Sequence, residues 1–207
     1  MKYKIKKQNS GYTIVETMIA ISVFIVVIMS GMAALLNANV LHQKSQDMRS
    51  IIDNLSFIME DMSRNMRTGY NFRCYDSVLP WDASYVNTPT LSTPRSCTTG
   101  GAIVFENSFG SSSLSSDQWV YKIESQDGGT TYNVYKSIDG GQNFVQLNSS
   151  EIIINSISGF SVIGAEAPSG DTQQPFVIIR LVGQINYKNV QTPFNLETAV
   201  SQRFPDL

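Results

Sequence analysis

The sequence contains few of the residues from which enzyme active sites are built. Among its 207 residues there is one histidine, His42, and there are two cysteines, Cys74 and Cys97. His42 lies just past a long apolar run, where no Ser/His/Asp arrangement can be built around it, and two isolated cysteines do not have the ligand spacing of a zinc site. We therefore expect no catalytic residue, no metal site and no cofactor.

Charge is also scarce. Only 15% of the residues are charged, with 15 Lys and Arg against 17 Asp and Glu, whereas 42% are apolar. A nucleic-acid-binding scaffold needs a basic face to neutralise phosphates, so this balance argues against a nucleic-acid partner. The apolar content excludes an intrinsically disordered chain.

The charges that exist are unevenly placed at the N-terminal end. Residues 1–11 contain four lysines and no acid, and no Asp, Glu, Lys or Arg occurs from Thr17 to Gln43. A run of about 20 apolar residues is long enough to cross the ~30 Å hydrocarbon layer as a helix. Lysines directly before it favour a cytoplasmic N-terminus. We predict a single membrane pass over residues 12–40, with everything after about residue 40 outside the cytoplasmic membrane.

Glu16 lies at the start of this apolar run. A carboxylate costs about 2.5–3.5 kcal/mol at the bilayer centre and less near its edge. One interpretation places Glu16 in the first helical turn, where the helix dipole favours an acid. The other requires cleavage after Gly11, so that Glu16 of one copy pairs with the new α-amine of Tyr12 in its neighbour. Such a pair would fix the stagger of parallel helices, because other registers leave a bare charge.

The lysine-rich leader is followed by Gly11, the aromatic Tyr12, Thr13-Ile14-Val15 and then Glu16. This segment resembles the processing signal of type IV pilins and type II secretion pseudopilins, whose pattern is Gly, Phe or Tyr, Thr, two hydrophobic residues and Glu. The resemblance implies that a prepilin peptidase cuts after Gly11 and methylates the amine of Tyr12. It also implies that Glu16 guides docking into a filament.

The resemblance covers about residues 1–65, and two features depart from the family pattern. Tyr12 stands where Phe is more common. Many major pilins carry a helix-kinking proline about twenty residues into the mature chain, whereas this sequence has Gly31 as its nearest weak point. Removal of the leader would leave eleven basic against 17 acidic residues.

Beyond Leu41 the apolar residues recur at steps of three and four, which predicts an amphipathic helix. We expect one helix from about Thr13 to Thr68, ended by Gly69. The second half of this helix, residues 41–69, is expected to cover a domain. The expected core stripe is Met48, Ile51, Ile52, Leu55, Ile58, Met59, Met62 and Met66.

Residues 70–101 are rich in Ser, Thr and Pro, lack a sustained period and are expected to form an irregular connector. Both cysteines lie in it. Outside the cytoplasm a Cys74–Cys97 disulfide is one interpretation, and it would stabilise the fold by about 3–3.5 kcal/mol in the chain-entropy model. Two free buried thiols are the other.

Residues 102–207 alternate in the manner of strands, which predicts an antiparallel β head. Asp139-Gly140-Gly141 is expected to form a hairpin turn within a Ser137-x-Asp139-x-Gly141-x-x-Phe144 box. The fold class is therefore α+β, a long N-terminal helix packed on an antiparallel sheet, which is also the architecture that the resemblance implies. The expected strands are 102–106, 118–124, 132–137, 143–147, 152–163, 176–187 and 194–203.

The closing segment, Phe194-x-Leu196-x-Thr198-x-Val200-x-x-Arg203, is similar to J-type minor pseudopilins and related minor pilins. The implied function is a minor subunit that initiates or caps a type IV pilus or secretion pseudopilus. The implied partners are a prepilin peptidase, other pilin or pseudopilin subunits, an inner-membrane assembly platform and membrane lipid. The implied location is the cytoplasmic membrane and then a cell-surface or periplasmic filament. Two alternatives stay open: a tip adhesin or DNA-uptake pilin, and a signal-anchored extracellular binding domain that is never cut.

Overall fold

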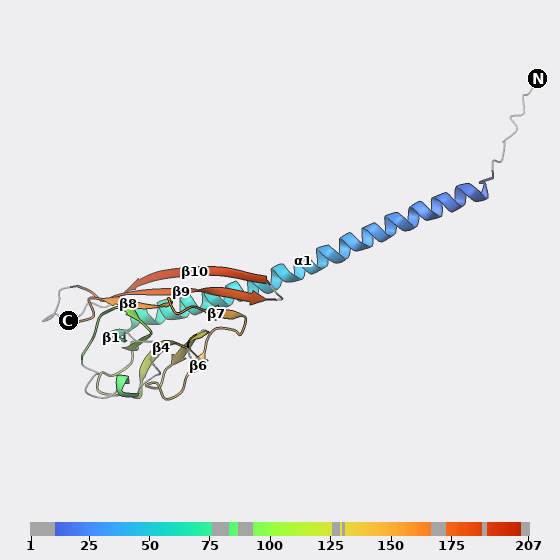
Figure 1. Ribbon diagram of the computed structural model, residues 1–207. Helices are drawn as coiled ribbons and strands as arrows, with labels where there is room; N and C mark the ends of the chain where they lie inside the picture. Colours follow the sequence, from blue (N-terminus) through green and yellow to red (C-terminus); the bar gives the residue numbers. More distant parts are fainter. Residues whose placement is uncertain are drawn as a thin grey trace, which may run out of the picture. The chain divides into compact units, whose positions relative to one another are not determined.

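A computed structural model describes residues 11–75, 83–86, 93–125, 129, 131–166, 173–187 and 190–203. One long helix, α1 (Ile14–Thr68), precedes ten strands and one short 3₁₀ helix, η1 (Ala83–Val86), in the described residues (Figure 1). The strands are β1 (Tyr70–Tyr75), β2 (Cys97–Gly100), β3 (Ala102–Glu106), β4 (Gln118–Ser125), β5 (Tyr132–Ser137), β6 (Val145–Gln146), β7 (Ile152–Ile154), β8 (Gly159–Ile163), β9 (Phe176–Tyr187) and β10 (Val190–Ser201). The predicted α+β class is confirmed, and α1 begins within one residue of the expected position.

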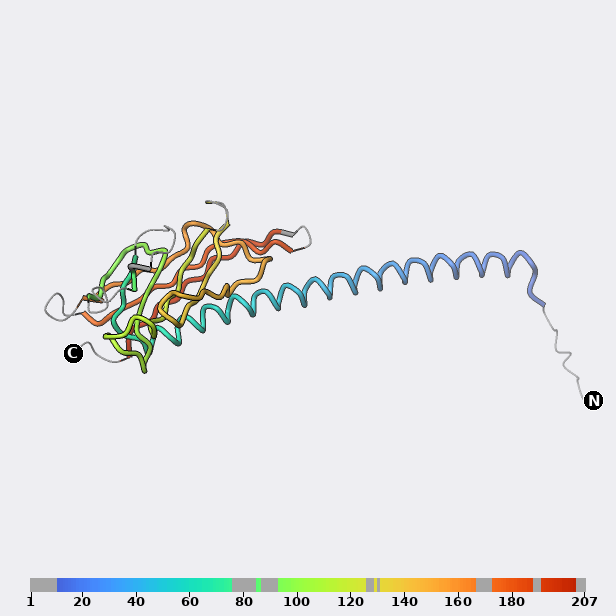
Figure 2. Tube along the Cα trace, turned by 90° about the horizontal axis from the view of Figure 1, so that it is seen from below, coloured from blue at the N-terminus to red at the C-terminus, as the bar shows by residue number. Residues whose placement is uncertain are grey.

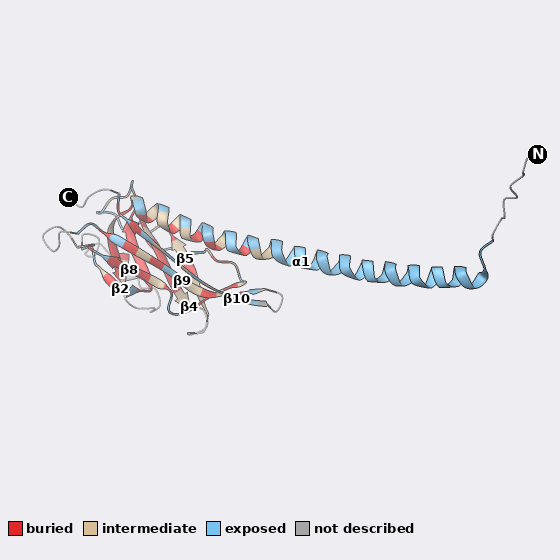
Figure 3. Ribbon diagram, turned by 90° about the horizontal axis from the view of Figure 1, so that it is seen from above, coloured by how far each residue is buried: buried red, intermediate tan, exposed pale blue. Residues whose placement is uncertain are grey.

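The chain divides into two compact units, Met1–Asp47 and Met48–Leu207. In the first unit every described residue up to Gln46 is exposed, including the large apolar side chains. This helix is long and apolar enough to cross a membrane. Figure 3 shows the change of α1 from exposed on all sides to buried along one side.

The second unit contains one antiparallel sheet in which β9 is central. β10 pairs with β9 over the full length of both strands, and β8 and β7 share the opposite edge of β9. Figure 2 traces β9 and β10 side by side in orange and red. From β7 the sheet continues through β5, β4 and β3 to β1, and from β8 it continues to β2.

The two ends of the sheet meet where β1 lies beside β2. The N–H of Cys74 donates to the carbonyl of Arg95 at 3.0 Å, and the N–H of Arg95 donates to the carbonyl of Phe72 at 2.9 Å. A disulfide joins Cys74 to Cys97 at the same place. The two ends of the sheet are therefore joined by backbone hydrogen bonds to Arg95, just before β2, and by the disulfide.

One side of α1 supplies the inner core. Its buried residues, Ile51, Leu55, Ile58, Met62 and Met66, belong to one cluster with the inward side chains of the sheet. The predicted stripe is confirmed except at Ile52, which is 48% exposed. On β9 the predicted alternation holds: Val177, Ile179 and Leu181 are buried, whereas Phe176 and Arg180 face solvent.

Residues 70–101 correct the expectation of an irregular connector. β1 and β2 lie in this segment and are members of the sheet. Val86 of η1 packs with Val104 and Val120 on the outer face of β3 and β4. Strands of four and six residues with little alternation carry no periodic signal, so the sequence does not predict β1 and β2.

The expected strand over residues 152–163 is two strands, β7 and β8. Between them Ser158 donates its hydroxyl to the carbonyl of Val182 at 2.9 Å and accepts the N–H of Val182 at 2.8 Å. This side chain occupies the place of a ladder partner on β9, so the strand pairing breaks there. The closing strand, expected over 194–203, runs from Val190 to Ser201.

Gly69 follows the last turn of α1, as expected, but not in a left-handed conformation. Its N–H donates to the carbonyl of Asn65 at 3.0 Å, and its φ is not positive. A Cβ at this position would overlap the ring of Phe105. Glycine is therefore required by the close approach of the helix end to β3, rather than by its backbone freedom.

The buried stripe on α1 should dominate the stability of the second unit. We expect Met62→Ala to lower the free energy of unfolding by about 2–5 kcal/mol, because it leaves a cavity at a fully buried position. Phe57→Ala is the control on the exposed side of α1, where Phe57 is 64% exposed, and it should change the value by less than about 1 kcal/mol. Denaturant unfolding of the full chain in detergent, followed by near-UV circular dichroism, measures both. Equal losses would show that the stripe is not the main contact.

Candidate processing and assembly site

The segment around the expected cleavage point lies before the helix. Gly11, Tyr12 and Thr13 are not helical, all three are exposed, and nothing lies within 4 Å of the position of a Gly11 Cβ. A peptidase needs an accessible backbone, and the Gly11–Tyr12 bond is exposed and non-helical. The leader, residues 1–10, lies outside the described residues.

Thr13 caps the start of α1. Its hydroxyl oxygen accepts the backbone N–H of Glu16 at 3.3 Å, and its carbonyl accepts the N–H of Thr17 at 3.2 Å. The spacing Thr-x-x-Glu is that of a capping box, and the acid stands in the first turn, where the helix dipole favours it. The structure thus places Glu16 where the first interpretation expects it, while its exposed position leaves it accessible to a neighbouring chain.

Three hydroxyl groups of the apolar half form their hydrogen bonds within the helix itself. The hydroxyls of Thr17, Ser22 and Ser30 each donate to the carbonyl three residues earlier, at 2.8, 2.8 and 2.9 Å. In hydrocarbon every unpaired polar group is costly, so such bonds suit a helix that lies in lipid. Gly31 is helical and has open space where a Cβ would stand.

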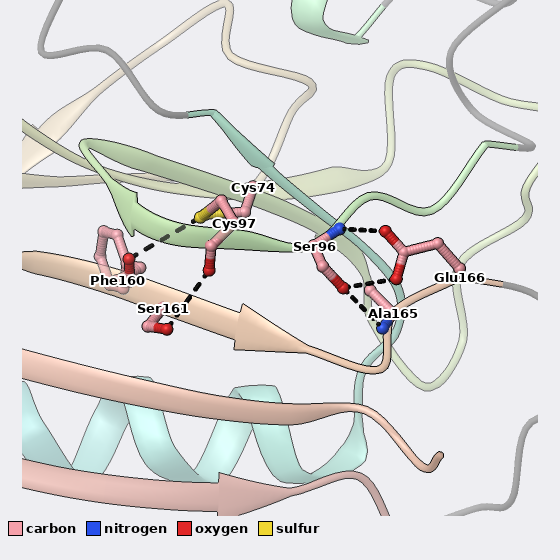
Figure 4. The surroundings of a disulfide bond; sticks show 7 residues. All are labelled: Cys74, Ser96, Cys97, Phe160, Ser161, Ala165 and Glu166. Carbon is pink, nitrogen blue, oxygen red and sulfur yellow. Dashed lines mark hydrogen bonds between the residues drawn. A yellow bond between two sulfur atoms is a disulfide. The ribbon is translucent and has the colours of Figure 1, made fainter. Parts of the chain in front are cut away.

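The disulfide lies among buried contacts between strands (Figure 4). Cys74 is fully buried, and Cys97 lies across from Val162 of β8. Beside them Glu166 accepts two hydrogen bonds from Ser96, from the N–H at 2.9 Å and from the hydroxyl at 2.5 Å. These bonds lower the pKa of the Glu166 carboxyl, against the opposing effect of burial. The two cysteines therefore form a buried cross-link between strands rather than a pair of free thiols.

A buried polar chain crosses three strands and was not found from the sequence. Arg73 of β1 donates through Nη2 to Oε1 of Gln118, and Nε2 of Gln118 donates to Oε1 of Glu106 at 2.6 Å. All three side chains are almost completely buried. Burial lowers the pKa of Arg73 and raises the pKa of Glu106. The members stand 12 and 45 residues from Gln118 in sequence, so no local motif could reveal them.

A second polar cluster attaches α1 to the sheet. Asp61 accepts hydrogen bonds from Lys136 at 2.9 Å and from the hydroxyl of Tyr121 at 2.7 Å, and Asn65 donates to Asp61 at 3.0 Å. Lys136 also lies 4.6 Å from the ring centre of Trp119. Burial raises the pKa of Tyr121 well above its usual range. Each charge in this cluster has a partner, and the hydrogen bonds of Asp61 join α1 to the sheet. We therefore assign the cluster a structural role.

The Ser137–Phe144 box forms the expected turn. Gly140 and Gly141 have φ values of 71° and 77°, which L side chains rarely adopt. The Asp139 carboxylate accepts the N–H of Asn143 at 3.0 Å and the hydroxyl of Ser137 at 2.6 Å. These bonds lower its pKa to about 2. The carboxylate oxygens accept hydrogen bonds from backbone and side-chain groups of the turn itself, so the box stabilises a turn.

Within the described residues no group of three or more His, Cys, Asp and Glu side chains lies close enough to hold a metal ion. A cavity of about 460 Å³ opens on the outer face of the sheet over β2, β8 and β9, with Arg180 and Glu197 at its border. It contains no histidine or cysteine and no pair of acids. The arrangement offers hydrogen-bonding surface without a nucleophile–base pair.

No family model, no curated protein and no solved structure matches this chain.

The disulfide should contribute to stability through loop closure. We expect Cys74→Ala with Cys97→Ala to lower the free energy of unfolding by about 3 kcal/mol, because the open chain regains loop entropy when it unfolds. Ser161→Ala is the control: it removes the 3.3 Å hydrogen bond to the Cys97 carbonyl but keeps both sulfurs, and should cost about 1 kcal/mol. Denaturant unfolding, with a thiol count by mass spectrometry, measures the effect. Wild-type stability of the double variant would contradict it.

The Asp139 turn should respond to acid. Because the folded-state pKa lies below the ordinary value of 3.8, the carboxylate stabilises the fold above about pH 4, and this contribution disappears as the pH falls toward 2. We expect Asp139→Asn to lower stability at pH 7 and to weaken its decline between pH 4 and 2. Ser137→Ala, which removes one donor, should raise the pKa of Asp139 toward 3.8 in a carboxyl NMR titration. An unchanged pKa in that variant would contradict the assignment.

Proposed function

We propose that this protein is a minor subunit of a type IV pilus or type II secretion pseudopilus, which helps to initiate or cap filament assembly after a prepilin peptidase removes residues 1–11. One observation carries the proposal. The Gly11–Tyr12 bond is exposed and non-helical, and it stands two residues before a helix whose apolar side chains are uncovered on every side through Leu41. A chain with this surface requires lipid or other apolar helices around it.

In this proposal the apolar half of α1 first holds the subunit in the cytoplasmic membrane, with the lysines on the cytoplasmic side. Assembly then exchanges lipid for the helices of neighbouring subunits. Since lipid and apolar helices are equally hydrophobic, this exchange is driven by packing and by polar contacts rather than by the hydrophobic effect. An assembly platform in the membrane would supply the work, and the head would lie outside the membrane.

Glu16 has two roles in this scheme, and they are separable. Its position in the first turn contributes about 0.3–1 kcal/mol to the helix start. That amount is small for a helix of 55 residues, so loss of the acid leaves α1 formed. Pairing with the methylated amine of Tyr12 from a neighbouring subunit would instead decide whether a subunit enters the filament in register.

Processing is the first test. Intact mass and N-terminal sequencing of the full chain from membranes, with and without a prepilin peptidase, should show loss of residues 1–11 and a methylated Tyr12 only with the peptidase. Gly11→Val should block cleavage, because the Gly position is the one that the family signal requires. An intact leader beside an active peptidase would overturn the filament proposal and leave a signal-anchored extracellular domain.

Register is the second test. We expect Glu16→Ala and Glu16→Gln to be processed and inserted in the membrane as the wild type is, but to be lost from sheared filament or pseudopilus fractions by at least about tenfold. Thr17→Ala is the control on the same turn, because its hydroxyl only donates to the Ile14 carbonyl. Filament recovery of Glu16→Ala at the wild-type level would show that Glu16 acts only as part of the helix cap.

A further inference from the structure

A groove runs between the last turns of α1 and the outer side of β10. A cavity of about 430 Å³ is lined by Glu60, Ser63, Arg64 and Arg67 on the helix and by four consecutive residues, Thr198–Ser201, on the strand. A second cavity, of about 410 Å³, shares Arg67 and Ser201 with the first and is also lined by Gln202 and Arg203. Figure 1 shows β10 in red beside this part of α1.

The strand side of this groove is a free sheet edge. Successive side chains of a strand point to opposite faces, so a cavity that touches four residues in a row follows the edge of the strand. β10 pairs with β9 along one edge, and no strand in the described part of the chain pairs with the other. Backbone N–H and C=O groups on such an edge can accept another strand.

The helix side of the groove is rich in arginine. The N–H of Arg203 donates to the carbonyl of Arg67 at 2.9 Å, which brings these two residues together at the end of α1. Neither guanidinium has an acidic partner among the residues that the structure describes. In the described part of the chain, the one acidic partner of Arg64 is the exposed carboxylate of Glu60, at 3.1 Å. The helix dipole accounts for Arg67, but Arg203 arrives from β10 and adds a like charge beside it.

Among the described residues that line this groove, three guanidiniums and one carboxylate give an excess of two positive charges, although the chain has a net charge of −2. The unpaired backbone groups of the free edge can hydrogen-bond to another extended backbone, and the arginines can pair with carboxylates. A phosphate-bearing ligand would satisfy only the second requirement. The geometry points to one class of occupant, an extended acidic polypeptide.

We propose that this groove binds an acidic segment of a partner protein, which adds as a strand to β10 at Thr198–Ser201 and places carboxylates against Arg67 and Arg203. Affinity comes from the backbone hydrogen bonds of strand addition, and selectivity comes from the two arginines. This inference concerns the second unit alone and does not depend on leader cleavage or on filament assembly.

The test uses the full chain in detergent micelles and a fluorescent, N-acetylated hexapeptide of alternating valine and glutamate. We expect saturable binding by fluorescence anisotropy at 50 mM salt, weaker at 300 mM. Arg67→Gln with Arg203→Gln should raise Kd at least about tenfold, because two charge-assisted hydrogen bonds are lost. Arg180→Gln removes an exposed arginine outside the groove and should leave Kd unchanged. Near-UV circular dichroism checks that the double variant is folded.

A second peptide separates strand addition from charge alone. The same sequence with alternate backbone nitrogens methylated keeps every carboxylate but cannot pair with a strand edge, and we expect its Kd to be at least about tenfold higher. Equal binding of the methylated peptide would overturn strand addition. Binding by the double arginine variant at the wild-type level, or no saturable binding of the unmodified peptide at 50 mM salt, would overturn the acidic site.

Discussion

The buried stripe of α1 is the contact on which the rest of the second unit depends. The helix repeats every 3.6 residues, so the stripe from Ile51 to Met66 fixes how α1 is rotated against the sheet. That rotation determines where the other side chains of the same turns stand. Asp61 meets Lys136 and Tyr121 on the sheet, and Arg67 reaches the edge of β10. The Asp61 cluster and the arginine groove are therefore consequences of where the buried apolar stripe lies on α1.

The sheet needs cover on both faces at β3 and β4, and two different parts of the chain supply it. α1 covers the inner face, where Phe105 and Tyr121 lie. On the outer face Val86 of η1 packs against Val104 and Val120, and the stacked rings of Tyr75 and Tyr85, 4.1 Å apart, hold that segment in place. This double burial explains why β3 is buried at every position instead of alternating.

Sequence analysis predicted the features that depend on residues close together in the sequence. An uncharged apolar run followed by a three- and four-residue period is sufficient for α1, and strict alternation is sufficient for β9. The Asp139 turn is equally local. By contrast, the break between β7 and β8 depends on Ser158 reaching Val182, 24 residues away. The arginine groove joins Arg67 to Arg203, and no sequence pattern connects them.

The buried Arg73–Gln118–Glu106 chain has a physical reason in the register of β1. Pairing of β1 with β3 shifts by one residue between Tyr70 and Arg73, and Asn71 has a φ of 57° at this bulge. A slip of one residue turns every side chain of a strand to the other face. In the observed register Arg73 meets Gln118, whereas a slip would bury a guanidinium against the apolar core. Because a buried guanidinium without a hydrogen-bond partner is far more costly than a mispacked methyl group, the bond from Arg73 to Gln118 favours the observed register, in which Cys74 also forms its disulfide with Cys97.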